Sequence, residues 1–333
     1  MVKIAEQAME GFALASEPSA FMVDNFPFLK HMPEWLPGGG FKKKAREMFE
    51  DRERLYEVPF KFVREQIESQ LARRCFLLLT PVIGKGQGLR SFVSASLETR
   101  GDPEREELIK AAAASLYSGG IDTTPSSLSA FVLAMALHPH VQARAQAELN
   151  KVLGLSFERL PCFADRPKMP YINAVVREIL RWNPAVPLGL AHRLASDDSY
   201  RGYFLPEGLV VWANIWTMTR DQGLYPSPDI FDPERFLDDE GNLGSSGTDN
   251  IPFGFGRRIC PGLYFAENSI WIAVATILYC FEIKKTKDAN GVEIEPVVDF
   301  DGFVSHPKPF KCDIKPRLEA AKALLHEKIT HDE

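Results

Sequence analysis

Apolar and polar positions in the first half of the chain follow the period of a helix. The pattern predicts a helix over residues 104–137, which begins among glutamates and ends before Pro139. It predicts a second helix over residues 141–153. Arg144 and Glu148 are four positions apart on that helix, so we expect them to pair across one turn.

A third helix is predicted over residues 171–182. Its apolar side chains recur at i, i+3, i+4, i+7 and i+8, which places them on one stripe. Pro170 suits the first helical position, and Pro184 ends the helix. The stripe indicates that one face of this helix packs in a core.

Beyond Pro184 the pattern changes to short strands and turns. Residues 203–205, a Pro-Glu-Gly turn and residues 209–212 predict a β-hairpin. They are followed by a buried helix from Pro261 to about Phe281 and by strands near residues 281–283 and 310–314. The fold class is therefore mainly α with a small β-rich part.

A single domain fits this pattern. Its helical part spans about residues 1–183, its β-rich part about 184–315, and a polar tail covers 316–333. Residues 74–88 join an apolar burst to a glycine-rich stretch, but they lack the order of a phosphate-binding loop. We assign that segment no function.

Composition narrows the classes of function. The 333 residues are 45% hydrophobic, so a large core is expected. A net charge of −6 gives no indication of a nucleic-acid partner. The longest apolar run, residues 269–281, is typical of a core helix, and the amino terminus shows no signal sequence, so the chain is expected to be soluble and cytoplasmic.

The five cysteines lie far apart, and none forms a CxxC pair. Their odd number and spacing argue against a disulfide framework and against a zinc site. One functional thiol among inert ones fits better.

The strongest candidate for that thiol is Cys260, within the string PFGFGRRICPG at residues 252–262. Its glycines let the backbone approach a flat ligand. If Pro261 starts the following helix, Cys260 lies at a helix amino terminus, which favours a thiolate that can ligate iron. Arg258 can then reach an anionic group at the edge of the ligand. A buried structural cysteine is the alternative, and for a lone cysteine it would be preferred.

The full string F-x-x-G-x-R-x-C-x-G, however, resembles the haem-binding loop of the cytochrome P-450 superfamily. Other segments resemble the family in the expected order. Glu178 and Arg181 form E-x-x-R, and DPERF at residues 232–236 resembles the family's P-E-R-F. The resemblance implies that Arg235 joins Glu178 and Arg181 as a buried structural triad.

The string GGIDTT at residues 119–124 resembles the family's [AG]-G-x-[DE]-T-T. Paired glycines and Pro125, which cannot donate to Ile121, are expected to weaken or kink the helix. Asp122 and the Thr123 hydroxyl are then placed to deliver protons during catalysis. Small residues that serve packing alone are the alternative.

A basic residue for a haem propionate is implied in the segment HRLASD, residues 192–197. Arg193 is the better candidate because a guanidinium holds a carboxylate in a bidentate fork; His192 assists or is a surface residue. By family position, residues 185–190 and 303–305 line the substrate pocket, with core packing as the alternative. Residues 26–28 and 33–41 look like a segment that roofs this pocket in fungal members.

The resemblance implies a haem-thiolate monooxygenase of the cytochrome P-450 fold. Its cofactor is haem b, held through Cys260, and it inserts one oxygen atom into a small apolar substrate. Its electrons come from an NADPH-dependent flavin reductase that docks near Arg257. Full-length members are longer and sit at the endoplasmic reticulum membrane, and the first third of the family pattern is absent here. A truncated remnant without catalysis is therefore the second hypothesis.

Overall fold

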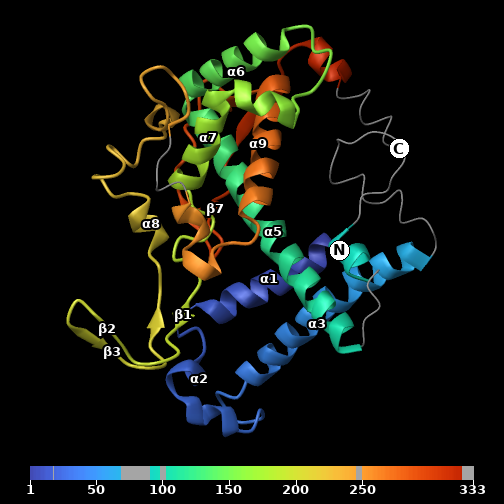
Figure 1. Cartoon of the computed structure of the whole chain (residues 1–333), viewed down its shortest axis with the longest axis vertical. Coiled ribbons are helices and arrows are strands. Elements are labelled where there is room, and N and C mark those ends of the chain that lie inside the picture. Colours follow the sequence, from blue (N-terminus) through green and yellow to red (C-terminus); the bar gives the residue numbers. More distant parts are fainter. Residues whose placement is uncertain (18, 69–90, 98–102, 245–249, 325–333) are drawn as a thin grey trace. The chain divides into compact units, whose positions relative to one another are not determined.

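The structure is a computed structural model (Figure 1), which describes residues 1–17, 19–68, 91–97, 103–244 and 250–324. Most of these residues lie in helices, and the strands found among them form only two-stranded sheets. The predicted class, mainly α with a small β part, is confirmed. Residues 74–88 lie outside the described part of the chain.

The helices and strands follow each other along the chain with these bounds. The α-helices are α1 Val2–Ser16, α2 Met22–Asn25, α3 Phe41–Glu68, α4 Phe92–Leu97, α5 Pro103–Leu137, α6 Pro139–Leu153, α7 Pro170–Trp182, α8 Ile215–Met218 and α9 Leu263–Cys280. Short 3₁₀ helices are η1 Pro27–His31, η3 Phe163–Lys168, η4 Pro233–Phe236, η5 Ile251–Phe253 and η6 Gly256–Arg258. The strands are β1 His192–Arg193, β2 Asp198–Tyr200, β3 Tyr203–Leu205, β4 Val210–Val211, β5 Phe281–Lys285, β6 Phe300–Asp301, β7 His306–Pro307 and β8 Cys312–Pro316.

The chain divides into two compact units, Met1–Asp122 and Thr123–Glu333. Helix α5 runs from the first unit into the second, so the division falls inside the long helix. In the first unit, α1 packs on α3, and the ammonium of Lys110 is nearly buried between Glu57 at 2.6 Å and Glu107 at 2.8 Å. Those hydrogen bonds raise the pKa of Lys110.

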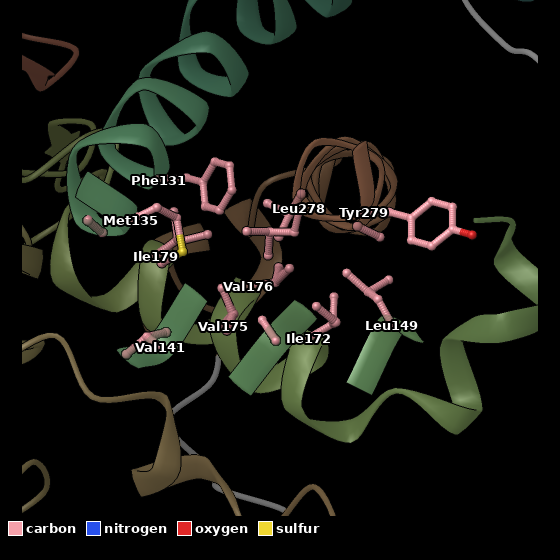
Figure 2. Packing of buried hydrophobic residues seen from close by; sticks show 14 of the residues in the cluster. Phe131, Met135, Val141, Leu149, Ile172, Val175, Val176, Ile179, Leu278 and Tyr279 are labelled. Carbon is pink, nitrogen blue, oxygen red and sulfur yellow. The ribbon is translucent and has the colours of Figure 1, made fainter. Parts of the chain in front are cut away.

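The core of the second unit lies between the end of α5 and helices α6, α7 and α9 (Figure 2). Ile172, Val175 and Ile179 form the predicted stripe of α7 and are fully buried. Among the described residues, α9 is the one helix whose length and composition would suffice to cross a membrane. It contributes Trp271 and Leu278 to the core, as predicted for a core helix.

Glu148 on α6 does not pair with Arg144, and that prediction is wrong. Each carboxylate oxygen of Glu148 instead accepts one backbone N–H at the start of α7, from Tyr171 and Ile172, both at 2.9 Å. Arg144 forms an ion pair with Glu234 and stacks on the Tyr171 ring at 4.4 Å. Two unsatisfied N–H groups at a helix start attract the carboxylate more strongly than an exposed arginine does.

The hairpin predicted over residues 203–212 is also wrong. Strand β3 pairs with β2, and β4 pairs with β1, both antiparallel. Arg201 and Gly202 both have positive φ, which is the backbone of the two-residue turn that joins twisted strands best. The turn at residues 206–209 exists, but it connects this inner hairpin to the outer strand pair.

The predicted strands near residues 281–283 and 310–314 are β5 and β8, which pair antiparallel. The region expected to be a polar tail begins inside this sheet, because β8 ends at Pro316. Ala321 and Leu324 then join the core of the second unit. Residues 316–324 are therefore part of the fold.

Candidate functional site

Backbone conformation shapes the loop around Cys260. Gly254 has φ 84° and ψ −163°, and Gly256 has φ 60°. Side chains rarely tolerate either conformation, which explains why glycines stand there. The Cys260 N–H donates to the carbonyl of Phe253 at 2.8 Å, and this bond closes the loop that contains both glycines.

The helix after the loop starts later than predicted. Helix α9 begins at Leu263 with Gly262 as its N-cap, so Pro261 is not the first helical residue. Pro261 and Gly262 form a turn instead, and the first bond of the helical ladder runs from the Ala266 N–H to the Gly262 carbonyl at 2.8 Å. Because the dipole effect fades within one turn, it acts on Cys260 less than the sequence suggested.

The environments of the four described cysteines test whether the chain fits a haem iron. Cys260 is the exposed one. Burial raises the pKa of Cys280 to about 11 and also raises that of Cys312, so both stay neutral thiols. The Cys162 thiol donates to Asp165, whose pKa is held well below its usual range by a bidentate bond from Arg159.

Of the four described cysteines, only Cys260 combines access with open space in front of its loop, since a Cβ at Gly254 or Gly256 would meet no atom within 4 Å. Within the described residues, no group of three or more His, Cys, Asp or Glu side chains could hold a metal ion in its place. One exposed cysteine sulfur with open space in front of it fits an axial haem ligand.

The basic residues predicted to hold propionates are all exposed: Arg193 and His192 on β1, and Arg258 on η6. The guanidinium of Arg193 lies against Gly208, where an added Cβ would be 3.3 Å from its Nη2 atom. His192 Nδ1 lies 2.8 Å from the Leu190 carbonyl, which fixes the ring at the strand start.

Glu178, Arg181 and Arg235 come together as the resemblance implied. Arg181 donates to both oxygens of Glu178 at 2.6 and 2.7 Å, and Nε of Arg235 lies 3.3 Å from Oε1 of Glu178. Glu178 is fully buried, and burial raises its pKa against the opposing hydrogen bonds from Arg181. The backbone N–H of Asp232 adds a bond of 2.8 Å to the same carboxylate.

Helix α5 carries Asp122 and Thr123, both partly buried, at the point where the two units divide. The helix continues through Pro125 without a break, so the expected weakening does not interrupt it. A Cβ at Gly119 or Gly120 would meet no atom of its own unit within 4 Å. Close packing inside that unit therefore does not require these glycines.

The predicted pocket segments differ in exposure. Leu188 and Leu190 are exposed, whereas Val304 and Ser305 are buried. Ser305 belongs to a buried polar cluster with Ser126 and Asn183, which the sequence did not predict. No short motif could have found it, because its members lie 57 to 179 positions apart along the chain and meet only in the fold.

Comparison with known proteins shows which family the chain resembles over most of its length. The family model described as Cytochrome P450 matches residues 3–314. Cytochrome P450 monooxygenase 208 of Postia placenta is 44% identical over 98% of this chain and 60% of its own length. Cytochrome P450 monooxygenase claR of Ampulloclitocybe clavipes is 41% identical over 98% and 57%, respectively. Tryptamine 4-monooxygenase of Psilocybe cyanescens is 39% identical over 96% of this chain and 61% of its own length.

These relatives are fungal proteins, as the resemblance suggested. The chain spans about 60% of the length of the curated relatives that it matches.

Proposed function

The chain belongs to the cytochrome P450 family, and from that premise we propose that it serves as a haem-thiolate monooxygenase. The reaction inserts one oxygen atom of dioxygen into a small apolar organic substrate. The observation that carries this proposal is the loop around Cys260, where two glycines with positive φ and the bond from Cys260 N–H to Phe253 hold an exposed thiol.

When bound, haem b supplies the redox chemistry that activates dioxygen. Cys260 holds the iron as a thiolate, and its electron donation tunes the metal. Arg193 and Arg258 would neutralise the two propionates through charge-assisted hydrogen bonds, and His192, next to Arg193 on β1, would assist. Glu178, Arg181 and Arg235 are proposed to stabilise the haem-binding fold and to take no part in the chemistry.

Protons reach the site through Asp122 and the hydroxyl of Thr123, which are adjacent on α5. A Thr123→Ala variant is expected to divert reducing equivalents from product to peroxide. We propose that electrons come from an NADPH-dependent flavin reductase that docks near the exposed Arg257. Full coupling of electron use to product in Thr123→Ala would contradict the proton-delivery role.

The decisive test is the difference spectrum of the reduced, haem-reconstituted chain with carbon monoxide. We expect a red-shifted Soret band, its loss in Cys260→Ala and its retention in the matched variant Cys162→Ala. Bound haem should also protect Cys260, and not Cys162, from alkylation. A chain that takes up no haem would instead support the second hypothesis, a remnant without catalysis.

A further inference from the structure

Three segments of the second unit meet at one buried carbonyl. The carbonyl oxygen of Ser305 accepts a hydrogen bond of 2.6 Å from the Ser126 hydroxyl on α5 and one of 2.8 Å from the Asn183 amide after α7. The Ser305 hydroxyl donates back to the Asn183 side-chain oxygen at 2.7 Å. The Ser305 N–H donates to the Ala185 carbonyl at 2.9 Å.

This cluster is sealed from water. Ser126, Asn183 and Ser305 are exposed by 0%, 3% and 6%, respectively. Every polar group of Ser305 therefore has a partner inside the protein. A fully satisfied buried network has one well-defined geometry. Each lost donor leaves a buried acceptor without a hydrogen bond, which lowers the stability of the fold.

The turn that Ser305 ends is itself tight. Gly302 has φ 95°, and an added Cβ there would lie 2.8 Å from the Val304 carbonyl oxygen. Residues 302–305 therefore have few conformations, and the cluster ties their last residue to α5. A shift of α5 at Ser126 would move the turn with it.

Each member of the cluster lies beside a segment of the proposed site. Ser126 follows Thr123 by three positions, Asn183 precedes the pocket segment 185–190, and Ser305 closes the pocket segment 303–305. A cluster that served stability alone could stand anywhere in the core. This one joins the three chain segments whose mutual placement would define the pocket wall.

We propose that Ser126, Asn183 and Ser305 are positioning residues that set the shape of the substrate pocket through the chain segments that they hold together. This inference rests on the proposed function. They fix residues 303–305 against α5 and against residues 185–190. Loosening the cluster should change which ligands the pocket accepts, and not only how stable the protein is.

Ser126→Ala and Ser305→Ala test this in the haem-reconstituted full chain. Ser127→Ala is the matched control, because Ser127 is equally buried on the same helix but donates to the Thr123 carbonyl of its own helix. Ser126→Cys is a second variant of nearly the same shape with a weaker donor, which guards against loss of folding. Urea unfolding verifies that each variant folds.

The probes are imidazole and the bulkier 4-phenylimidazole, titrated by the shift of the Soret band. We expect the ratio of their dissociation constants to change by about fivefold or more in both cluster variants and to stay unchanged in Ser127→Ala. Amide exchange at Ser305 should accelerate about tenfold in Ser126→Ala.

Faster exchange with an unchanged ratio would show that the cluster only supports the fold, and would overturn this inference alone. The absence of a Soret band in the unaltered chain would overturn the proposed function, and this inference with it. The two failures are therefore distinguishable in one series of samples.

Discussion

The triad around Glu178 and the loop around Cys260 were both found from short strings, yet they are built by opposite means. Glu178 and Arg181 are buried, and their geometry comes from side-chain hydrogen bonds. Cys260 is exposed, and its geometry comes from two glycine conformations and one backbone bond. The first region stabilises the fold through buried side chains, whereas the second keeps a reactive sulfur atom accessible to a ligand.

This difference explains where changes to the chain should act. Removing one partner from a buried ion pair strands a charge in the core, which is costly. Removing an exposed thiol leaves no buried group without its partner. The triad should therefore respond in global stability, and the loop in local chemistry.

The largest effect is expected from Arg181→Ala. This change leaves the Glu178 carboxylate buried with Arg235 at 3.3 Å and without its bidentate partner. We expect a loss of about 3–5 kcal/mol in the free energy of unfolding, measured in urea on the haem-free chain. Cys260→Ala should change it by less than about 0.5 kcal/mol.

Arg144→Ala is the control for the triad, because both side chains of its ion pair with Glu234 are about half exposed. Such a pair contributes less than about 1 kcal/mol. If Arg181→Ala lowered the free energy of unfolding by as little as Arg144→Ala is expected to, the triad would not support the fold.

The second prediction compares thiols. In a haem-free Cys75→Ser background at pH 8, a maleimide should alkylate Cys260 first and Cys280 last. Burial raises the pKa of Cys280 to about 11, so roughly 0.1% of it is thiolate at pH 8. Its rate should rise with pH until about pH 11, because the thiolate is the nucleophile.

Peptide mass spectrometry at timed intervals gives the rate for each cysteine. Cys280 is also fully buried, which slows it further. If Cys280 or Cys162 reacted faster than Cys260, the loop would not hold the accessible thiol, and the contrast with the buried regions would fail.

Sequence patterns predicted what depends on neighbours along the chain. The stripe of α7 and the i, i+3 pair of Glu178 and Arg181 follow from helical geometry alone. Arg235 lies 57 positions from Glu178, so only the family resemblance could place it there. The partners of Glu148 and Ser126 are likewise distant, and no local rule pointed to them.

The two wrong strand and helix boundaries have a common cause. At residues 203–212, alternation suggested one hairpin, but the turn at Arg201 and Gly202 selected different strand pairs. At Pro261, a proline that suits a helix start lies in a turn, and Gly262 caps the helix instead. In both places a turn decided the backbone, and the pattern of apolar residues did not record it.

The smallest effect is expected from Gly254→Ala, and it sharpens the contrast between the triad and the loop. No atom lies within 4 Å of the added Cβ, so its cost is backbone strain of about 1–3 kcal/mol. The loop can relieve this strain by breaking the bond from Cys260 N–H to Phe253. We therefore expect amide exchange at Cys260 to accelerate about tenfold, while the urea midpoint shifts little.

Gly262→Ala is the control for this prediction, because φ at Gly262 is −88° and its Cβ would make an ordinary contact of 3.7 Å with Cys260 Sγ. It should leave exchange at Cys260 nearly unchanged. If Gly254→Ala instead lowered global stability as much as Arg181→Ala does, strain in the loop would be coupled to the core. The loop would then be part of the scaffold, and its geometry would not be a locally adjustable feature.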